Sequence, residues 1–210
     1  MTAVLDKMEQ SLRSVSRLGV WCGGLMMLAA TLIIGAEVVL RKIFLLSLGG
    51  ADEMASYALA IGTVWALSFA LIERAHIRVD AVYARLPKRL GAAFDILALV
   101  SVLAFTSVLT WFAAHVFLTS WNFDATANTP IGTPLWIPQG LWVLGLVVFV
   151  LTTTVLILRT TVAFLAGDID TVTSIAGTKS IEGELGEEIA HVGESQALVG
   201  EPAHSVPVKE

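Results

Sequence analysis

The sequence predicts an all-α integral membrane protein with four transmembrane helices, short amphipathic interfacial helices and both termini in the cytoplasm. Three observations support this fold class. Of the 210 residues, 56% are hydrophobic and only 15% are charged, whereas an average soluble domain has roughly 25% charged residues. The hydrophobic residues are gathered into four long runs, and the basic residues are concentrated on one side of the predicted spans.

Each of the four runs is long enough to cross a bilayer as a helix. A span needs about 20 apolar residues for a hydrocarbon core about 30 Å thick, and backbone groups in lipid must bond within their own segment. The first run exceeds the apolar core of a cleaved signal peptide, so we expect it to be retained. The predicted four-helix domain is 18–166, with spans at about 18–40, 54–72, 92–118 and 135–160.

The distribution of Lys and Arg predicts the orientation. Eleven of these residues precede the first span, lie between the second and third spans, or follow the fourth span. The opposite side carries two, Arg41 and Lys42, and the third loop, 119–134, carries none. Because basic residues collect in cytoplasmic segments, we expect both termini and the second loop to be cytoplasmic.

Two segments outside the spans have the spacing of interfacial amphipathic helices. In the cytoplasmic N-terminal segment 1–17, apolar residues recur at helical intervals between charged ones. The segment 78–90 repeats the pattern, with an interruption at Pro87. The alternative is that the first span begins early and that the second loop is irregular.

The C-terminal segment 167–210 differs in composition from the rest of the chain. It holds nine acidic residues and two lysines and lacks aromatic residues. Such a segment buries too little apolar surface to offset the entropy of ordering. We expect an acidic, disordered cytoplasmic tail, with a contact site for a soluble partner as the alternative.

Residues typical of catalysis are missing from the predicted spans. Cys22 is the single cysteine, and His115 is the single histidine within a span. A lone cysteine excludes a thiol pair or a thiolate metal cluster, and we expect His115 to be a hydrogen-bonded packing residue. The sequence therefore predicts a protein that is not an enzyme, with no catalytic residues, no cofactor, no metal site and no nucleic-acid partner.

Charged residues at the ends of the spans have structural explanations. Glu37 precedes Arg41 by four residues, which favours an ion pair on one helical face. Asp52 and Glu53 open the second span, where acidic residues favour the positive helix N-terminus, and Asp95 lies in the first turns of the third span. Because an intramembrane charge is also a functional hint, a coupling-ion role for Glu37 stays open as the alternative.

Small residues form a ridge along the second span. They recur at every fourth position, and small residues let helices approach closely in a membrane. This ridge favours helix packing, either within the chain's own bundle or against a second membrane protein. Its members are Ala58, Gly62, Ala66 and Ala70.

Three stretches together resemble one family of membrane proteins. The first is Glu37-Val38-Val39-Leu40-Arg41-Lys42-Ile43-Phe44 with Asp52-Glu53, the second is Trp65 with His76-Ile77-Arg78-Val79-Asp80 and Leu86-Pro87, and the third is Thr133-Pro134-Leu135-Trp136-Ile137-Pro138. Over residues 10–165 the chain resembles the small membrane subunit of tripartite ATP-independent periplasmic (TRAP) transporters. It departs from the family pattern at Lys42, where an aromatic residue is frequent, and at Gly50-Ala51 before the acidic pair.

The resemblance implies partners and a location. A periplasmic substrate-binding protein captures an organic anion, often a carboxylate, and a large multi-span membrane subunit imports it with a sodium gradient. The small subunit, in the bacterial inner membrane and in contact with its lipid, scaffolds the large one and has no substrate-binding residues. Two alternatives remain, a stand-alone ion-coupled transporter that uses Glu37 and an assembly subunit of another membrane complex.

The resemblance also suggests which residues contact a partner or maintain the structure. Our hypothesis is that one group organises the outer end of the bundle and another organises its inner end. The outer group is Arg41, Asp52 and Glu53, and the inner group is His76, Arg78 and Asp80.

Overall fold

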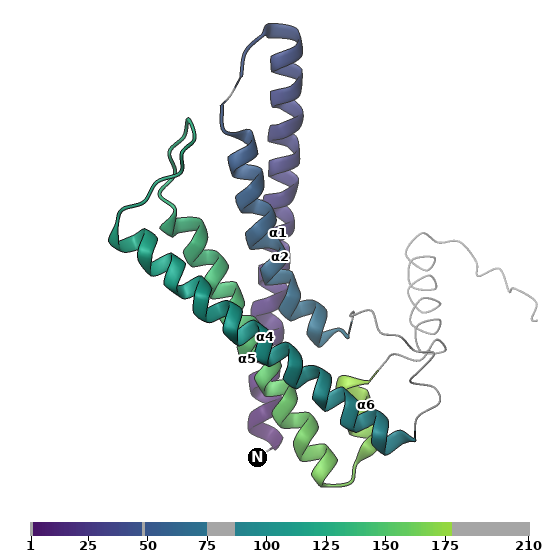
Figure 1. Cartoon of the computed structure of the whole chain (residues 1–210). Helices are drawn as coiled ribbons and strands as arrows, with labels where there is room; N and C mark the ends of the chain where they lie inside the picture. The colour runs from purple at the N-terminus through teal and green to yellow at the C-terminus, as the bar shows by residue number, and fades with distance from the viewer. Residues whose placement is uncertain (1, 48, 75–86, 178–210) are drawn as a thin grey trace, which may run out of the picture. The chain divides into compact units, whose positions relative to one another are not determined.

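The structure is a computed structural model that describes residues 2–47, 49–74 and 87–177. Over these residues the chain is all-helical, and four of its helices are long and apolar enough to cross a membrane. The prediction of an all-α membrane protein with four spans is confirmed. The helices are α1 Thr2–Phe44, α2 Ala51–Ile72, α4 Lys88–Asn122, α5 Trp136–Leu165 and α6 Ile169–Ala176 (Figure 1).

Helices α1 and α2 form a close antiparallel pair. A Cβ atom at Gly23 would lie 2.8 Å from the Cα atom of Gly62, so the two backbones touch at this crossing. One turn further along, Gly19 leaves room for the ring of Trp65. The salt bridge between Arg13 and Glu73 closes the pair at its end, with an N–O distance of 3.0 Å. Because glycine has no side chain, these positions let the two helices approach closely where they cross.

Helix α5 is the central helix of the described bundle, because it packs against α1, α2, α4 and α6. Gly145 receives Val64 and the indole of Trp65, and the indole Nε1 of Trp65 donates a hydrogen bond of 3.1 Å to the carbonyl oxygen of Leu141. A cluster of buried apolar side chains joins α2, α4, α5 and α6. Its buried members are Leu71, Leu99, Phe149, Leu156 and Ala176.

The N-terminal segment differs from the expected interfacial helix. Residues 2–17 are continuous with the first span in one helix of 43 residues, so the prediction of a separate element was wrong and the alternative of an early start was correct. No glycine or proline interrupts the stretch before Gly19, and ion pairs to α5 hold its acidic face. The second amphipathic segment, 78–90, lies mostly outside the described residues.

The start of the predicted tail is also helical. Helix α6 follows the left-handed Gly167 (φ 78°) and begins at Ile169, and the side chain of its N-cap residue, Asp168, accepts a hydrogen bond from the backbone N–H of Thr171. Val172 is completely buried and Ala176 is nearly so, and α6 packs on α4 and α5. The prediction of a tail disordered from residue 167 was therefore wrong for 169–176, because this short segment carries an apolar face. Residues 178–210 lie outside the described residues.

Candidate functional site

Polar contacts collect at both ends of the bundle. We call the end with the first and third loops the loop end, and the end with the start of α1 and the close of α2 and α5 the terminal end. Along α2, Asp52 and Glu73 are separated by about 31 Å at a rise of about 1.5 Å per residue. That length matches a hydrocarbon core about 30 Å thick, so Asp52 and Glu73 mark the two boundaries of the core along α2.

At the loop end, Glu37 is a buried carboxylate with close polar partners. The guanidinium of Arg41 donates to its Oε1 atom at 2.6 Å, and the hydroxyl of Ser47 donates to the same atom at 2.7 Å. The Glu37 side chain is 8% exposed, whereas that of Arg41 is 65% exposed. The predicted pair at four-residue spacing is confirmed, and Ser47 from the first loop completes it.

Glu53 forms a second cluster at the loop end. Its carboxylate accepts hydrogen bonds from the hydroxyl of Tyr57 at 2.9 Å and from the hydroxyl of Thr129 in the third loop. Thr133 bonds to the same carboxylate. A Cβ atom on Gly50, whose φ is 146°, would collide with the side chain of Ile131. Glu53 therefore ties the start of α2 to the third loop.

The predicted outer group is divided between these clusters. Arg41 bonds to Glu37 and Ser47, whereas Glu53 bonds to Tyr57 and the third loop. Asp52 is exposed beside them. The structure thus brings all three residues to one end but gives Arg41 and Glu53 different partners. The predicted inner group, His76, Arg78 and Asp80, lies outside the described residues.

At the terminal end, Arg159 of α5 holds the start of α1. Its guanidinium forms salt bridges with Asp6, at 2.8 Å, and with Glu9. Arg159 and Glu9 are partly buried, with side chains 24% and 20% exposed. Sequence reasoning missed this cluster, although Arg159 is an isolated charge close to the end of an apolar run and such residues in membranes usually have partners.

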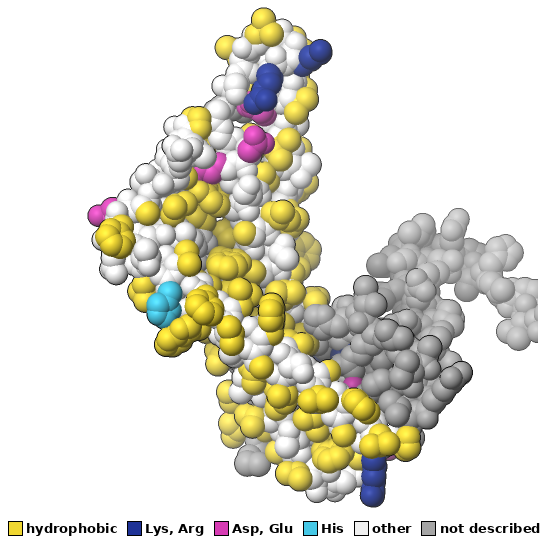
Figure 2. Space-filling model, in the orientation of Figure 1, with side chains coloured by type: hydrophobic (Ala, Val, Ile, Leu, Met, Phe, Trp, Pro, Cys, Tyr) yellow, Lys and Arg dark blue, Asp and Glu magenta, His cyan; other side chains and the backbone are white. Residues whose placement is uncertain are grey.

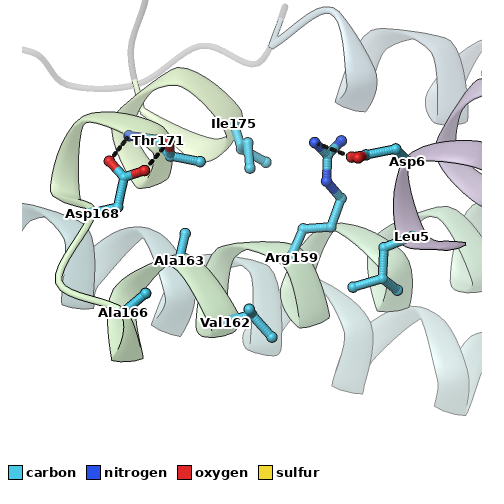
Figure 3. A pocket seen from close by; sticks show the side chains of 9 residues that line it. All are labelled: Leu5, Asp6, Arg159, Val162, Ala163, Ala166, Asp168, Thr171 and Ile175. Carbon is cyan, nitrogen blue, oxygen red and sulfur yellow. Dashed lines mark hydrogen bonds and ion pairs between the residues drawn. The ribbon is translucent and has the colours of Figure 1, made fainter. Parts of the chain in front are cut away.

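A cavity of about 270 Å³ lies beside Arg159, between α1, α5 and α6 (Figure 3). Asp168 and Thr171 line one part of it. The hydroxyl of Thr171 donates to Asp168 at 2.5 Å and its backbone N–H donates at 3.0 Å. These bonds, the hydroxyl first, lower the pKa of Asp168 below its ordinary value of 3.8, so the carboxylate is charged at neutral pH.

The small-residue ridge on α2 is buried or half-buried, whereas His115 on α4 is exposed. Ala58 and Gly62 are buried, and Ala66 and Ala70 are half-buried, and Gly62 meets Gly23 of the same chain. The Nδ1 atom of His115 lies 2.9 Å from the carbonyl oxygen of Trp111. His115 is thus hydrogen-bonded as expected, but it is exposed on α4 instead of packed in the bundle.

Much of the apolar surface of α1 and α4 is uncovered by the described chain. In the most apolar stretch of each span, 11% of the residues of α1 and 17% of those of α4 are buried, against 39% for α2 and 44% for α5. Figure 2 shows apolar side chains across the middle of one face and basic side chains near its two ends. This arrangement suits a protein surrounded by lipid or by other membrane helices.

The comparisons with known proteins agree with this arrangement. Residues 30–162 match the family described as the DctQ component of tripartite ATP-independent periplasmic transporters. Searches of curated proteins and of solved structures returned no match. The family is one of transporter components, not of enzymes, and its members are inner-membrane proteins. Since the match covers more than half of the sequence, the chain belongs to the family of small (DctQ) membrane components of TRAP transporters.

Proposed function

We propose that the chain is the small permease subunit of a sodium-gradient-driven TRAP transporter for an organic anion, most simply a carboxylate, and that it scaffolds the large transport subunit. A periplasmic substrate-binding protein delivers the anion to this membrane complex. The family match supports membership of such a complex. The single structural observation behind the scaffold role is the pair of peripheral helices, α1 and α4, that bury few of their apolar residues within the chain.

The apolar surfaces of these helices support a scaffold that packs against another membrane protein. Leu28 and Leu32 of α1 are 58% and 67% exposed, and Val108 and Trp111 of α4 are 57% and 65% exposed. Helices in a membrane associate through packing and polar contacts and not through hydrophobic burial. We therefore assign the interface with the large subunit to a face of α1 or α4, with its charged ends at the membrane boundaries.

Co-expression tests the scaffold role directly. The tagged chain and a large TRAP membrane subunit are produced together and purified in mild detergent. We expect the large subunit to co-purify and the reconstituted pair to import a carboxylate only with an inward sodium gradient. Uptake by the large subunit alone at the level of the pair would contradict scaffolding, and uptake by this chain alone would favour the stand-alone transporter.

Photo-crosslinking tests which face is the interface. A photoreactive residue is placed at Leu32 on α1 or at Val108 on α4, and the matched control is Leu146 of α5, which is 1% exposed. We expect a crosslink to the large subunit from at least one of the two exposed positions and none from the buried one. No crosslink from either exposed position would rule out the proposed faces.

The charged groups at the two ends form the second part of the proposal. We assign Arg41, Asp52 and Glu53 to the outer end and His76, Arg78 and Asp80 to the inner end. Replacing the inner three together with alanine should reduce co-purification and uptake. The control is the exposed Asp124 changed to alanine. Wild-type assembly and uptake in the triple variant would remove the inner group from the proposal.

A further inference from the structure

The cavity beside Arg159 has charged groups of both signs around an apolar floor. Figure 3 shows Asp168 with Thr171 on one side, Arg159 with Asp6 on the other, and Ala163 and Val162 of α5 between them. The cavity is partly open and holds about 270 Å³. A water molecule occupies about 30 Å³ in the liquid, so the space fits a small polar group and not a large organic molecule.

The depth of this cavity in the membrane follows from its contacts. Glu73 marks the end of the apolar part of α2 and pairs with Arg13 of α1. Arg159 contacts Glu9 and Asp6, which lie about 6 Å and about 10 Å beyond Arg13 along the helix at about 1.5 Å per residue. The headgroup region of a bilayer extends about 5–8 Å beyond the hydrocarbon core on each side. Glu9 thus lies within the headgroup region and Asp6 just beyond it, so the cavity lies at the outer edge of the lipid headgroups.

The charges around the cavity are unequal. Arg159 is matched by Asp6 and Glu9, and Asp168 adds a third carboxylate. Thr171 donates two hydrogen bonds to Asp168 but brings no positive charge, and Arg74 bonds to the carbonyl oxygen of Thr173 on α6. Among the described residues, the cavity thus has more carboxylates than cations around it, which favours a cationic group. Arg159 also has more N–H donors than its two ion pairs use.

We propose that this cavity binds the headgroup of a phospholipid that carries a primary ammonium, with the ammonium beside Asp168 and Asp6 and the phosphate beside Arg159. An ammonium can donate hydrogen bonds to carboxylate oxygens, and a guanidinium suits phosphate oxygens. Ala163 and Val162 form the apolar floor between these charged groups. A lipid held here connects α1, α5 and α6, so it acts as a structural part of the bundle.

Lipid chemistry provides a sharp test. The full-length chain in detergent is titrated with phosphatidylethanolamine, phosphatidylcholine or phosphatidylglycerol of identical acyl chains, and bound lipid is counted by native mass spectrometry. Phosphatidylcholine has the same charges but no ammonium N–H donors, and phosphatidylglycerol has no cation. Since hydrogen bonds to charged groups are the strong ones, we expect roughly tenfold preference for phosphatidylethanolamine. Equal binding of the three lipids, or preference for phosphatidylglycerol, would overturn the proposal.

A matched pair of variants locates the site. Asp168→Asn removes the charge but keeps a residue that caps helices as well as aspartate does, so α6 is retained. Asp170→Asn, in the same turn but away from the cavity lining, is the control. We expect the first variant to lose most of the preference and the second to keep it. The opposite result, or the same loss in both variants, would contradict the site. Asp6→Asn gives an independent check, because Glu9 still pairs with Arg159.

Discussion

Trp65 shows how single residues determine the packing of this bundle. Its indole lies against Gly19 of α1 and Gly145 of α5, and its Nε1 atom donates to the carbonyl oxygen of Leu141. An indole N–H in lipid requires such an acceptor. Glycines at the facing positions leave the space that this large side chain fills. One residue of α2 thus joins three helices, and small residues permit the contact.

Gly23→Ala should destabilise the bundle, whereas Gly24→Ala should not. A Cβ atom at Gly23 would lie 2.8 Å from the backbone of Gly62, while one at Gly24 would meet nothing within 4 Å. The first change must separate two helices, at a cost typical of overpacking, about 1–3 kcal/mol. The second raises helix propensity by up to about 1 kcal/mol. Thermal unfolding in one detergent compares them, and equal midpoints would contradict the close crossing.

At the scale of elements, the ends of the helices are held by charges contributed from other helices. The start of α1 is joined to α5 by Arg159 and to the end of α2 by the pair of Arg13 and Glu73. At the other end, Glu53 joins α2 to the third loop. Helices that cross a membrane gain little from hydrophobic burial against each other, so these polar contacts fix how the elements meet.

Arg159→Gln should release the first turns of α1. The change leaves Asp6 and Glu9 without their cation, and the pair is partly buried, so the cost lies between that of surface and buried pairs, about 1–3 kcal/mol. Hydrogen exchange should become faster across residues 2–13 and stay unchanged in α2. Arg17→Gln, at an exposed position of α1, serves as the control. Unchanged exchange at residues 2–13 would show that Arg159 does not hold them.

Helix α6 should lose stability in acid. The pKa of Asp168 is lowered in the folded chain by its bonds to Thr171. The stabilisation of α6 by the charged Asp168 carboxylate is therefore complete at pH values above the pKa of this group in the unfolded chain. It is lost as the pH falls through the lower pKa of the folded chain. The Thr171 amide resonance, followed by NMR as the pH is lowered, should titrate with a midpoint below the ordinary value of 3.8. In Asp168→Asn this transition should disappear. A midpoint at or above that value would contradict the capping bond.

At the scale of the whole molecule, charged residues lie at both ends of an apolar middle section. The basic residues lie mainly on the side of the termini, and the described helices place Arg13 and Arg159 together at the terminal end. Charged residues at both membrane boundaries resist sliding of the bundle along the membrane normal. This arrangement supports the proposed scaffold role.

The orientation inferred from the basic residues can be measured with single cysteines. In a Cys22→Ser background, Asn128→Cys in the third loop should react with an impermeant maleimide in intact spheroplasts. Ser205→Cys in the C-terminal segment should react only after permeabilisation, because basic residues keep their side cytoplasmic. The reverse labelling pattern would show that the bundle has the opposite orientation in the membrane.

Sequence patterns determined the features that depend on neighbours along the chain. The four spans follow from the length of apolar runs, and the pair of Glu37 and Arg41 follows from a spacing of one helical turn. The three stretches that resembled the family also identified it. Run length and periodicity report on one helix at a time, which is why these predictions succeeded.

Only the tertiary structure decided which distant residues meet. Glu9 and Arg159 are 150 positions apart, and Glu53 and Thr129 are 76 apart, so their pairing depends on the rotation and register of separate helices. The same applies to Trp65 between two glycines and to the short apolar face that orders α6. Local composition made residues 1–17 and 167–177 look like peripheral segments. Contacts across the bundle made them part of it, because a polar or apolar face becomes ordered where another element supplies its partner.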